Sequence, residues 1–301
     1  WMESEGNGDM KSLFRNKGAY MKAYTLGLYE KAMPQTLTWK EKLEAAKAAG
    51  YDFVEISIDE TDEKLARLDW SREERRELVD LMYQIGIPVR TMCLSGHRKY
   101  PIGSSDPEIC ARGMEIMAKA IQLADDLGIR IIQLAGYDVY YEESTPETVE
   151  RFGENLKKCE QMAARSGIVL GFETMETEFM NTVEKAMKYV QIIDSPYLGV
   201  YPDMGNITNA AKAYGTDVLE DIRTGAGHLD AVHLKETVPG VFREVPFGTG
   251  HVDFPAVIHE TWKAGVRRYV TEFWYTGSPR WKEELDFAAG MMRPILDTQA
   301  V

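Results

Sequence analysis

Hydrophobic and polar positions along the chain follow two patterns that alternate in a regular order. Short apolar or β-branched runs are typical of buried strands, and each is followed by a loop and then by an amphipathic helical pattern. We interpret eight such runs as strands: Tyr24–Leu28, Phe53–Ile58, Val89–Cys93, Ile131–Leu134, Val169–Glu173, Leu198–Tyr201, Ala231–Leu234 and Tyr269–Glu272.

Capping signals predict a helix after each strand. Thr38 with Glu41, and Ser71 with Glu74, have the spacing of capping boxes, and Pro107 follows Asp106 at a first helical position. Glycines suited to end helices are Gly50, Gly86, Gly128, Gly167 and Gly265. The remaining helices are expected from Thr145-Pro146, over 182–193, from Asp217 with Glu220 as its box partner, from Asp253, and from Ser278-Pro279 to about Ile295.

Strands that alternate with helices predict a parallel sheet covered by helices. Eight such units in one series predict a single (β/α)₈ TIM barrel over residues 21–301. A doubly wound sheet is the competing architecture, but the first strand lacks the following Gly-x-Gly-x-x-Gly turn. Residues 1–20 are polar and rich in Gly and Asn, and we interpret them as a leader or expression remnant that is disordered.

Composition excludes several classes of function. A formal net charge of −13 disfavours binding to nucleic acid or anionic membranes. The sequence lacks the run of about 18 apolar residues that a membrane-spanning helix needs, and its N-terminus lacks the apolar core of a signal peptide. Cys93, Cys110 and Cys159 are odd in number and widely spaced, which suits reduced thiols. We therefore expect a cytoplasmic protein without a nucleic-acid or membrane partner.

Four residues with metal-binding side chains fall at the ends of the last four strands. They are Glu173, Asp203, His233 and Glu272; the first three are spaced 30 positions apart, and Glu272 follows 39 positions after His233. The active site of a barrel lies at the carboxyl ends of its strands, so these side chains are expected to meet in one mouth. Taken singly, each carboxylate could cap a helix or pair with a lysine, and the histidine could be an ordinary core residue.

Together, the four side chains indicate a cation site. Three carboxylates close together would repel one another unless a divalent cation neutralised them. A set of three carboxylates and one imidazole suits Mn²⁺, Mg²⁺, Co²⁺ or Zn²⁺, and the sequence does not choose among these ions.

Several loops carry weaker signals. Lys235 and Glu236 could reach a substrate or form salt bridges, and the basic loop 95–99, which contains His97, could hold an anion or be solvated. The aromatic loop 136–141 could wall a pocket or simply pack. The backbone amides near Gly277 and Ser278 precede the last predicted helix, where barrels often bind phosphate.

The chain also resembles a known family over nearly all of residues 21–295. The stretches that carry the likeness are GLYEKAMP, FVEISIDETDEKLARLDWSREER, IQLAGYDVYYEE, YPDMGN, AVHLKETVPGVF and VPFGTGHVDF. They resemble the L-ribulose-5-phosphate 3-epimerases, also called L-xylulose-5-phosphate 3-epimerases and formerly hexulose-6-phosphate isomerases. These enzymes are sugar epimerase and isomerase barrels that share an architecture with endonuclease IV.

The resemblance implies one divalent metal ion held by Glu173, Asp203, His233 and Glu272. It also implies that Glu173 and Glu272 are the acid/base pair that moves the C3 proton of L-ribulose 5-phosphate or L-xylulose 5-phosphate through a metal-stabilised enediolate. A homodimer that acts on a sugar phosphate is expected. The chain departs from the related free-ketose epimerases at Asn206, where they place a substrate-binding histidine, and this change fits a phosphorylated pentulose.

Four rival functions remain open. An aldose–ketose isomerase or a dehydratase could use the same barrel and metal with a different proton path. A nuclease of the endonuclease IV type needs several histidine ligands, whereas only His233 lies on a predicted strand of this acidic chain. A non-catalytic sugar-binding barrel would bind the sugar without exchanging its C3 hydrogen, and the fold alone does not decide among these functions.

Overall fold

The computed structural model describes residues 22–300, so the segment 1–20 that we interpreted as a leader lies outside the described residues. All eight predicted strands are present, and each boundary lies within one residue of its predicted position. The strands are β1 (Thr25–Tyr29), β2 (Phe53–Ile58), β3 (Val89–Leu94), β4 (Ile131–Ala135), β5 (Val169–Glu173), β6 (Leu198–Val200), β7 (Val232–Leu234) and β8 (Arg268–Thr271).

The strands form one parallel sheet that closes into a barrel. Their order is β6-β5-β4-β3-β2-β1-β8-β7, and β1 pairs with β8 as a regular ladder. Isolated parallel bridges join β6 to β7 and complete the ring, one between Val200 and Leu229 and one between Asp203 and His233. In this β6–β7 seam, the His233 amide donates to the Pro202 carbonyl over 3.0 Å. The TIM barrel predicted from the sequence is confirmed.

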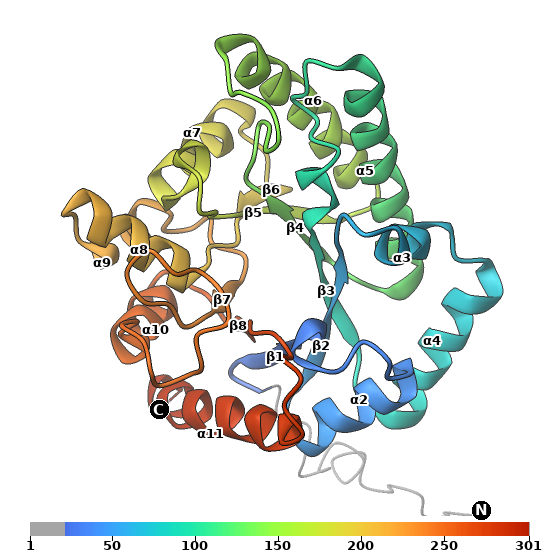
Figure 1. The fold of residues 1–301 in the computed structure, drawn as a ribbon, viewed down its shortest axis with the longest axis vertical. Helices are drawn as coiled ribbons and strands as arrows, with labels where there is room; N and C mark the ends of the chain where they lie inside the picture. Colours follow the sequence, from blue (N-terminus) through green and yellow to red (C-terminus); the bar gives the residue numbers. More distant parts are fainter. Residues whose placement is uncertain (1–21, 301) are drawn as a thin grey trace, which may run out of the picture.

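Helices surround the strands as an outer ring (Figure 1). Among residues 22–300, no helix is both long enough and apolar enough to cross a bilayer. The helices are α2 (Trp39–Ala48), α3 (Asp62–Leu65), α4 (Arg72–Ile85), α5 (Pro107–Leu127), α6 (Pro146–Arg165), α7 (Val183–Ile193), α8 (Met204–Tyr214), α9 (Val218–Thr224), α10 (Phe254–Lys263) and α11 (Trp281–Gln299).

The predicted capping boxes of α2 and α4 are both present, and Asp106 caps α5 as expected. Asp217 caps α9 through the amide of Leu219, rather than in a box with Glu220 as predicted.

Three helical segments differ from the sequence prediction, and the shortest is α3, whose four residues were not expected to form a helix. Helix α8 was missed, because its first turn contains Gly205 and Asn206, which are weak helix formers. Helix α11 begins at Trp281 rather than at Ser278-Pro279, because the Ser278 hydroxyl accepts the amide of Arg280 in a local turn.

Alternation along the strands divides the core into two regions. In β2, Val54, Ile56 and Ile58 belong to the large cluster that contains helix residues, whereas Phe53 belongs to a smaller cluster inside the barrel. Because side chains alternate with period two, Glu55 shares the inward face with Phe53. The same rule directs the strand-end carboxylates and His233 into the barrel interior.

A buried carboxylate fixes the loop that follows β1. Glu30 is buried and contacts three buried cations: Lys42 Nζ at 3.1 Å, Lys64 Nζ at 3.0 Å and the guanidinium of Arg67. It also accepts the Ser57 amide of β2 over 3.0 Å. Burial raises the pKa of Glu30, but the three cations outweigh burial and lower its pKa to about 2.

We expect Glu30→Gln to lower the free energy of unfolding by about 3 kcal/mol, because it leaves three buried cations without their anion. Urea unfolding followed by circular dichroism measures the loss, and Glu44→Gln, on the exposed face of α2, is the matched control with little expected effect. Since the folded-state pKa is depressed, the difference between wild type and variant should be full above about pH 4.5 and should fade as the pH approaches about 2. Equal stability of the two proteins at pH 7 would contradict this assignment.

Candidate active site

The four strand-end residues predicted from the sequence meet inside the mouth of the barrel. Glu173 ends β5, Asp203 follows β6, His233 lies in β7 and Glu272 follows β8, and all four are buried. One potential ligand atom from each lies within 4.8 Å of the corresponding atoms of the others. The sequence prediction of a single cluster is thus matched by the geometry.

His233 lies at the centre of this cluster. Its Nδ1 atom is 3.2 Å from Glu272 Oε2, 3.7 Å from Glu173 Oε1 and 3.9 Å from Asp203 Oδ2. Its other ring nitrogen, Nε2, lies 2.5 Å from Oε1 of Glu55 on β2. The imidazole therefore presents one nitrogen to the three carboxylates and the other to a separate buried carboxylate.

The two glutamates of the cluster differ in electrostatic environment. Burial raises the pKa of Glu173, and nearby His233 only partly opposes this effect. Burial also acts to raise the pKa of Glu272, but the cations Lys235 and His233 outweigh it and hold that pKa well below its ordinary value. Carboxyl groups whose pKa values are pushed in opposite directions are suited to act as an acid and a base in one site.

The basic groups of the cluster are held in their charged forms. Burial lowers the pKa of His233, but the carboxylates of Glu55 and Glu272 outweigh burial and raise it well above its ordinary value. Burial also lowers the pKa of Lys235, but the carboxylates of Asp203 and Glu272 outweigh burial and raise that pKa above its ordinary value. Without a metal ion, these two cations balance part of the negative charge of the carboxylates.

The donor atoms fit a divalent cation. Asp203 Oδ2 and Glu272 Oε2 are buried and accept no well-oriented hydrogen bond from residues 22–300, although Lys235 Nζ lies 3.0 and 3.5 Å from them. Three carboxylates and one imidazole form a ligand set typical of Mn²⁺, Mg²⁺, Co²⁺ or Zn²⁺. The cluster is therefore a possible metal site whose geometry does not identify the ion.

Asn206 and Lys235 lie beside the cluster, as expected for substrate-binding residues. Lys235 Nζ donates to Asn206 Oδ1 over 2.8 Å, and Asn206 Nδ2 donates to the Thr174 carbonyl over 2.7 Å. Both side chains line a cavity of about 60 Å³ that also reaches Glu173 and Glu272. Lys235 thus forms salt bridges and also faces the cavity, and its contact with a substrate stays a prediction.

Three further cations line this cavity, namely Lys31, Arg98 and Arg243. The Arg98 guanidinium stacks on Tyr140, 4.9 Å from the ring centre, so the aromatic loop after β4 packs against a cavity residue. Arg243 is half-exposed and lies 3.6 Å from Glu176. An anionic group of a bound molecule would find several positive charges here.

The other predicted substrate contacts lie away from this cavity. His97 is buried, and its Nε2 is hydrogen-bonded to the Gly113 carbonyl over 3.0 Å, whereas its neighbour Arg98 lines the cavity. Gly277 and Ser278 are also absent from its lining, although Thr276 lines a second cavity.

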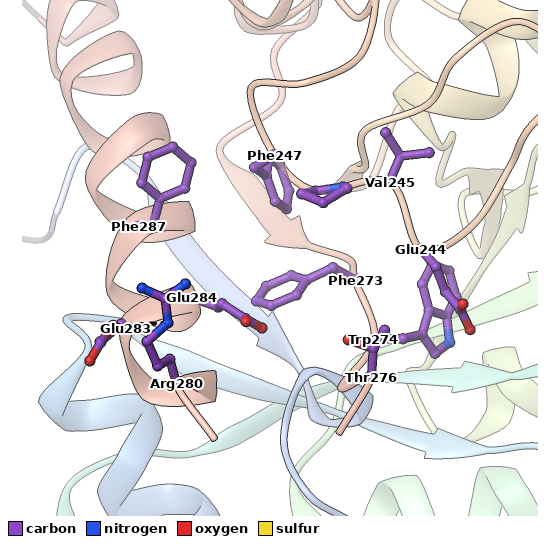
Figure 2. Close-up of a pocket in the computed structure, with 11 residues that line it drawn as sticks. Glu244, Val245, Phe247, Phe273, Trp274, Thr276, Arg280, Glu283, Glu284 and Phe287 are labelled. Carbon is purple, nitrogen blue, oxygen red and sulfur yellow. Dashed lines mark ion pairs between the residues drawn. The ribbon is translucent and has the colours of Figure 1, made fainter. Parts of the chain in front are cut away.

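This second cavity has a volume of about 360 Å³ and lies between α11 and the loop before α10. Figure 2 shows Phe247 and Phe273 on one side of it and Phe287 of α11 on the other. Trp274 lines both cavities and separates them. Aromatic and aliphatic side chains line much of the larger cavity, together with Glu244, Arg280, Glu283 and Glu284. The smaller cavity contains Glu173 and Glu272 of the cluster.

Comparisons with known proteins agree with this geometry. Residues 43–291 match the family described as xylose isomerase-like TIM barrel. The L-ribulose-5-phosphate 3-epimerase UlaE of Escherichia coli is 48% identical over 254 residues, which cover 84% of this chain and 88% of that protein. The chain belongs to the L-ribulose-5-phosphate 3-epimerase family. The family resemblance drawn from the sequence motifs is confirmed. The protein is therefore an enzyme of the isomerase class.

Solved structures share the fold at much lower identity. A structure of L-ribulose 3-epimerase aligns with a TM-score of 0.73 at 20% identity, covering 92% of this chain and 95% of that one. A D-psicose 3-epimerase crystallised in the presence of D-fructose gives a TM-score of 0.76 at 16% identity, covering 90% and 99%. At these identities, the comparison establishes the shared barrel of the epimerase-family chain and no detail of its site.

Sequence reasoning missed several residues of the site. Glu55 and Gln133 lie on inward faces of β2 and β4, where an acid or amide within an otherwise apolar strand was the available signal. Arg98 belongs to the basic loop that was singled out, but His97 was chosen in its place. Arg243 gave no signal beyond its place in the long loop after β7.

The two carboxylate oxygens of Asp203 lie in different environments, and mutations can test the function of each. Its Oδ1 accepts the Asn206 amide over 2.7 Å and caps α8, while Oδ2 faces the cluster. We expect both Asp203→Asn and Asp203→Ala to weaken binding of Mn²⁺, measured by calorimetry. Metal-free Asp203→Ala should also be about 1 kcal/mol less stable than Asp203→Asn, because asparagine still caps the helix.

Asp217, which caps α9 away from the cluster, provides the matched control. Asp217→Ala should be less stable than Asp217→Asn by a similar amount, with unchanged Mn²⁺ binding in both. Equal stability of the two Asp203 variants, or wild-type affinity for Mn²⁺ in either, would contradict the double function.

Proposed function

We propose that the protein is a metal-dependent 3-epimerase that interconverts L-ribulose 5-phosphate and L-xylulose 5-phosphate. The observation that carries the proposal is that Glu173 and Glu272 line one small cavity beside the His233 cluster, with their pKa values displaced in opposite directions. The 48% identity to an L-ribulose-5-phosphate 3-epimerase supports the same substrate pair. Glu173, Asp203, His233 and Glu272 are the proposed ligands of one divalent ion.

The proposed reaction exchanges the proton at C3 between two faces of the ketose. A bound divalent cation supplies positive charge that acidifies the C3 proton and stabilises the enediolate. Glu272 removes the proton from one epimer, and Glu173, protonated from solvent, returns one to the opposite face. In the reverse direction the two glutamates exchange functions. They come from β5 and β8, which β6 and β7 separate in the ring, so they approach the cavity from different directions.

Lys235 and Asn206 are proposed to orient the sugar oxygens, because both polar groups face the cavity. The 5-phosphate is proposed to bind Arg98 and Arg243, because guanidinium groups pair well with phosphate oxygens. His97, Gly277 and Ser278 receive no function in this arrangement. The expected homodimer and cytoplasmic location stay predictions, which light scattering and cell fractionation can test.

Turnover in D₂O distinguishes this function from its rivals. With Mn²⁺ present, proton NMR should show deuterium at C3 of the product from the first turnover, while C4 keeps its proton. An aldose–ketose isomerase would instead place deuterium at C1 or C2, and a sugar-binding protein would leave both epimers unchanged. Activity that is undiminished after complete removal of divalent metal would exclude the metal-dependent mechanism.

Glu173→Gln and Glu272→Gln should each lower kcat for epimerisation by about 10²–10⁴-fold, because glutamine cannot transfer a proton. If both variants retain Mn²⁺ in calorimetry, each should still exchange the C3 proton of one epimer only, and the two variants should act on opposite epimers. Exchange of the same epimer by both variants would contradict the assignment of two bases.

Arg243→Gln tests the phosphate contact. We expect the KM for L-ribulose 5-phosphate to rise about tenfold or more, because a charge-assisted hydrogen bond is lost, while kcat/KM for free L-ribulose stays nearly the same. Arg280→Gln, at an exposed arginine that lines only the second cavity, is the matched control. A similar loss with the phosphorylated and the free sugar would argue against phosphate binding at Arg243.

A further inference from the structure

Glu55 is a buried acid at the barrel centre that the proposed proton transfers do not use. It lies on the inward face of β2, and its side chain is fully buried. Its Oε1 is 2.5 Å from His233 Nε2, and its Oε2 accepts the Tyr201 hydroxyl over 2.8 Å. Both carboxylate oxygens are therefore engaged, one by the imidazole of the cluster and one by a residue that follows β6.

We propose that Glu55 is a positioning residue for the cation site, which holds the His233 ring so that the Nδ1 lone pair faces the three carboxylates. The inference rests on the proposed metal dependence and adds a residue to it. A carboxylate that accepts one imidazole N–H fixes the proton on that nitrogen and leaves the other nitrogen free as a ligand. It also makes the imidazole a stronger donor to a cation.

Contacts on the other edge of the ring agree with this orientation. Gln133 Nε2 lies 3.2 Å from His233 Nδ1 and 3.4 Å from the Tyr201 carbonyl. The carbonyl can only accept, so it assigns the amide nitrogen, rather than the amide oxygen, to this side of Gln133. An amide N–H on this side of the ring fits the neutral form of His233, which is the form that a cation binds. In that form Nδ1 carries no proton, and the one ring proton lies on Nε2, toward Glu55.

The chemical type of the residue also needs an explanation. A glutamine at position 55 could make the same two contacts, with its oxygen accepting from His233 Nε2 and its amide meeting the Tyr201 hydroxyl. It would do so without burying a negative charge, which is costly inside a protein. The charge of Glu55 is useful if it strengthens the imidazole as a ligand, and this use predicts a metal-binding defect rather than a folding defect.

The test compares wild type, Glu55→Gln and Tyr201→Phe, each freed of metal and titrated with Mn²⁺ in a calorimeter. Glu55→Gln should bind Mn²⁺ about 10–100-fold more weakly, while its metal-free form unfolds at an unchanged or higher urea concentration. At saturating Mn²⁺, its KM for L-ribulose 5-phosphate should equal that of wild type. Tyr201→Phe keeps the contact between Glu55 and His233, so its affinity for Mn²⁺ should fall by no more than a few-fold.

Wild-type affinity in Glu55→Gln would overturn the inference and leave the proposed function intact. A wild-type protein that binds no divalent cation would overturn both. Nitrogen-15 NMR of the Zn²⁺-loaded wild type locates the ring proton of His233 directly and does not depend on a Glu55 variant that folds. The His233 signals are identified by their loss in His233→Gln. The His233 proton is expected on Nε2, and a proton on Nδ1 would also overturn the inference.

Discussion

The structure depends on one constraint, which is that a closed ring of eight strands directs every second side chain into a narrow interior. Most of these inward positions near the base hold apolar or small residues, and the charged side chains nearer the mouth are also buried. Each must be balanced by another charge or by a ligand. Glu55, Glu173, Asp203 and Glu272 are therefore compensated by His233 and Lys235 within a few ångströms, and the opposite pKa displacements of Glu173 and Glu272 follow from this enforced proximity.

The buried acids of the molecule fall into two groups, those that hold loops in place and those that face the cluster. Glu30 and its three cations lie outside the barrel interior, under α2, and hold the loop that brings Lys31 to the cavity. Glu236 behaves similarly in the loop after β7, where it accepts the amides of Gly248 and Val252. These buried acids have donors for their oxygens, whereas Asp203 Oδ2 and Glu272 Oε2 accept no well-oriented hydrogen bond from the described residues.

The sequence predicted the fold and the four central residues because both depend on short-range patterns. Strand runs, capping boxes and βα spacing are each contained within a short stretch of sequence. The strand boundaries and the positions of Glu173, Asp203, His233 and Glu272 could therefore be predicted without coordinates. Features that depend on packing could not. Helix α8 is stabilised by its cap at Asp203 and by burial rather than by propensity, and Arg98 rather than His97 faces the cavity because of the direction of a tight 3₁₀ turn. Glu55 required knowledge that its strand lies across the barrel from His233.

The β6–β7 seam connects the cluster to the stability of the closed barrel. Every other pair of neighbouring strands is joined by a parallel ladder, with one register shift between β2 and β3, but this pair is joined by isolated bridges. One of these bridges links Asp203 to His233. Two of the four proposed ligands therefore lie on opposite sides of the strand pair that has no regular ladder among the described residues. An ion bound by both residues would cross-link the β6 and β7 sides of the barrel. Loss of the ion would favour local opening between these strands, and the amide of His233 would be among the first interior amides to exchange with solvent.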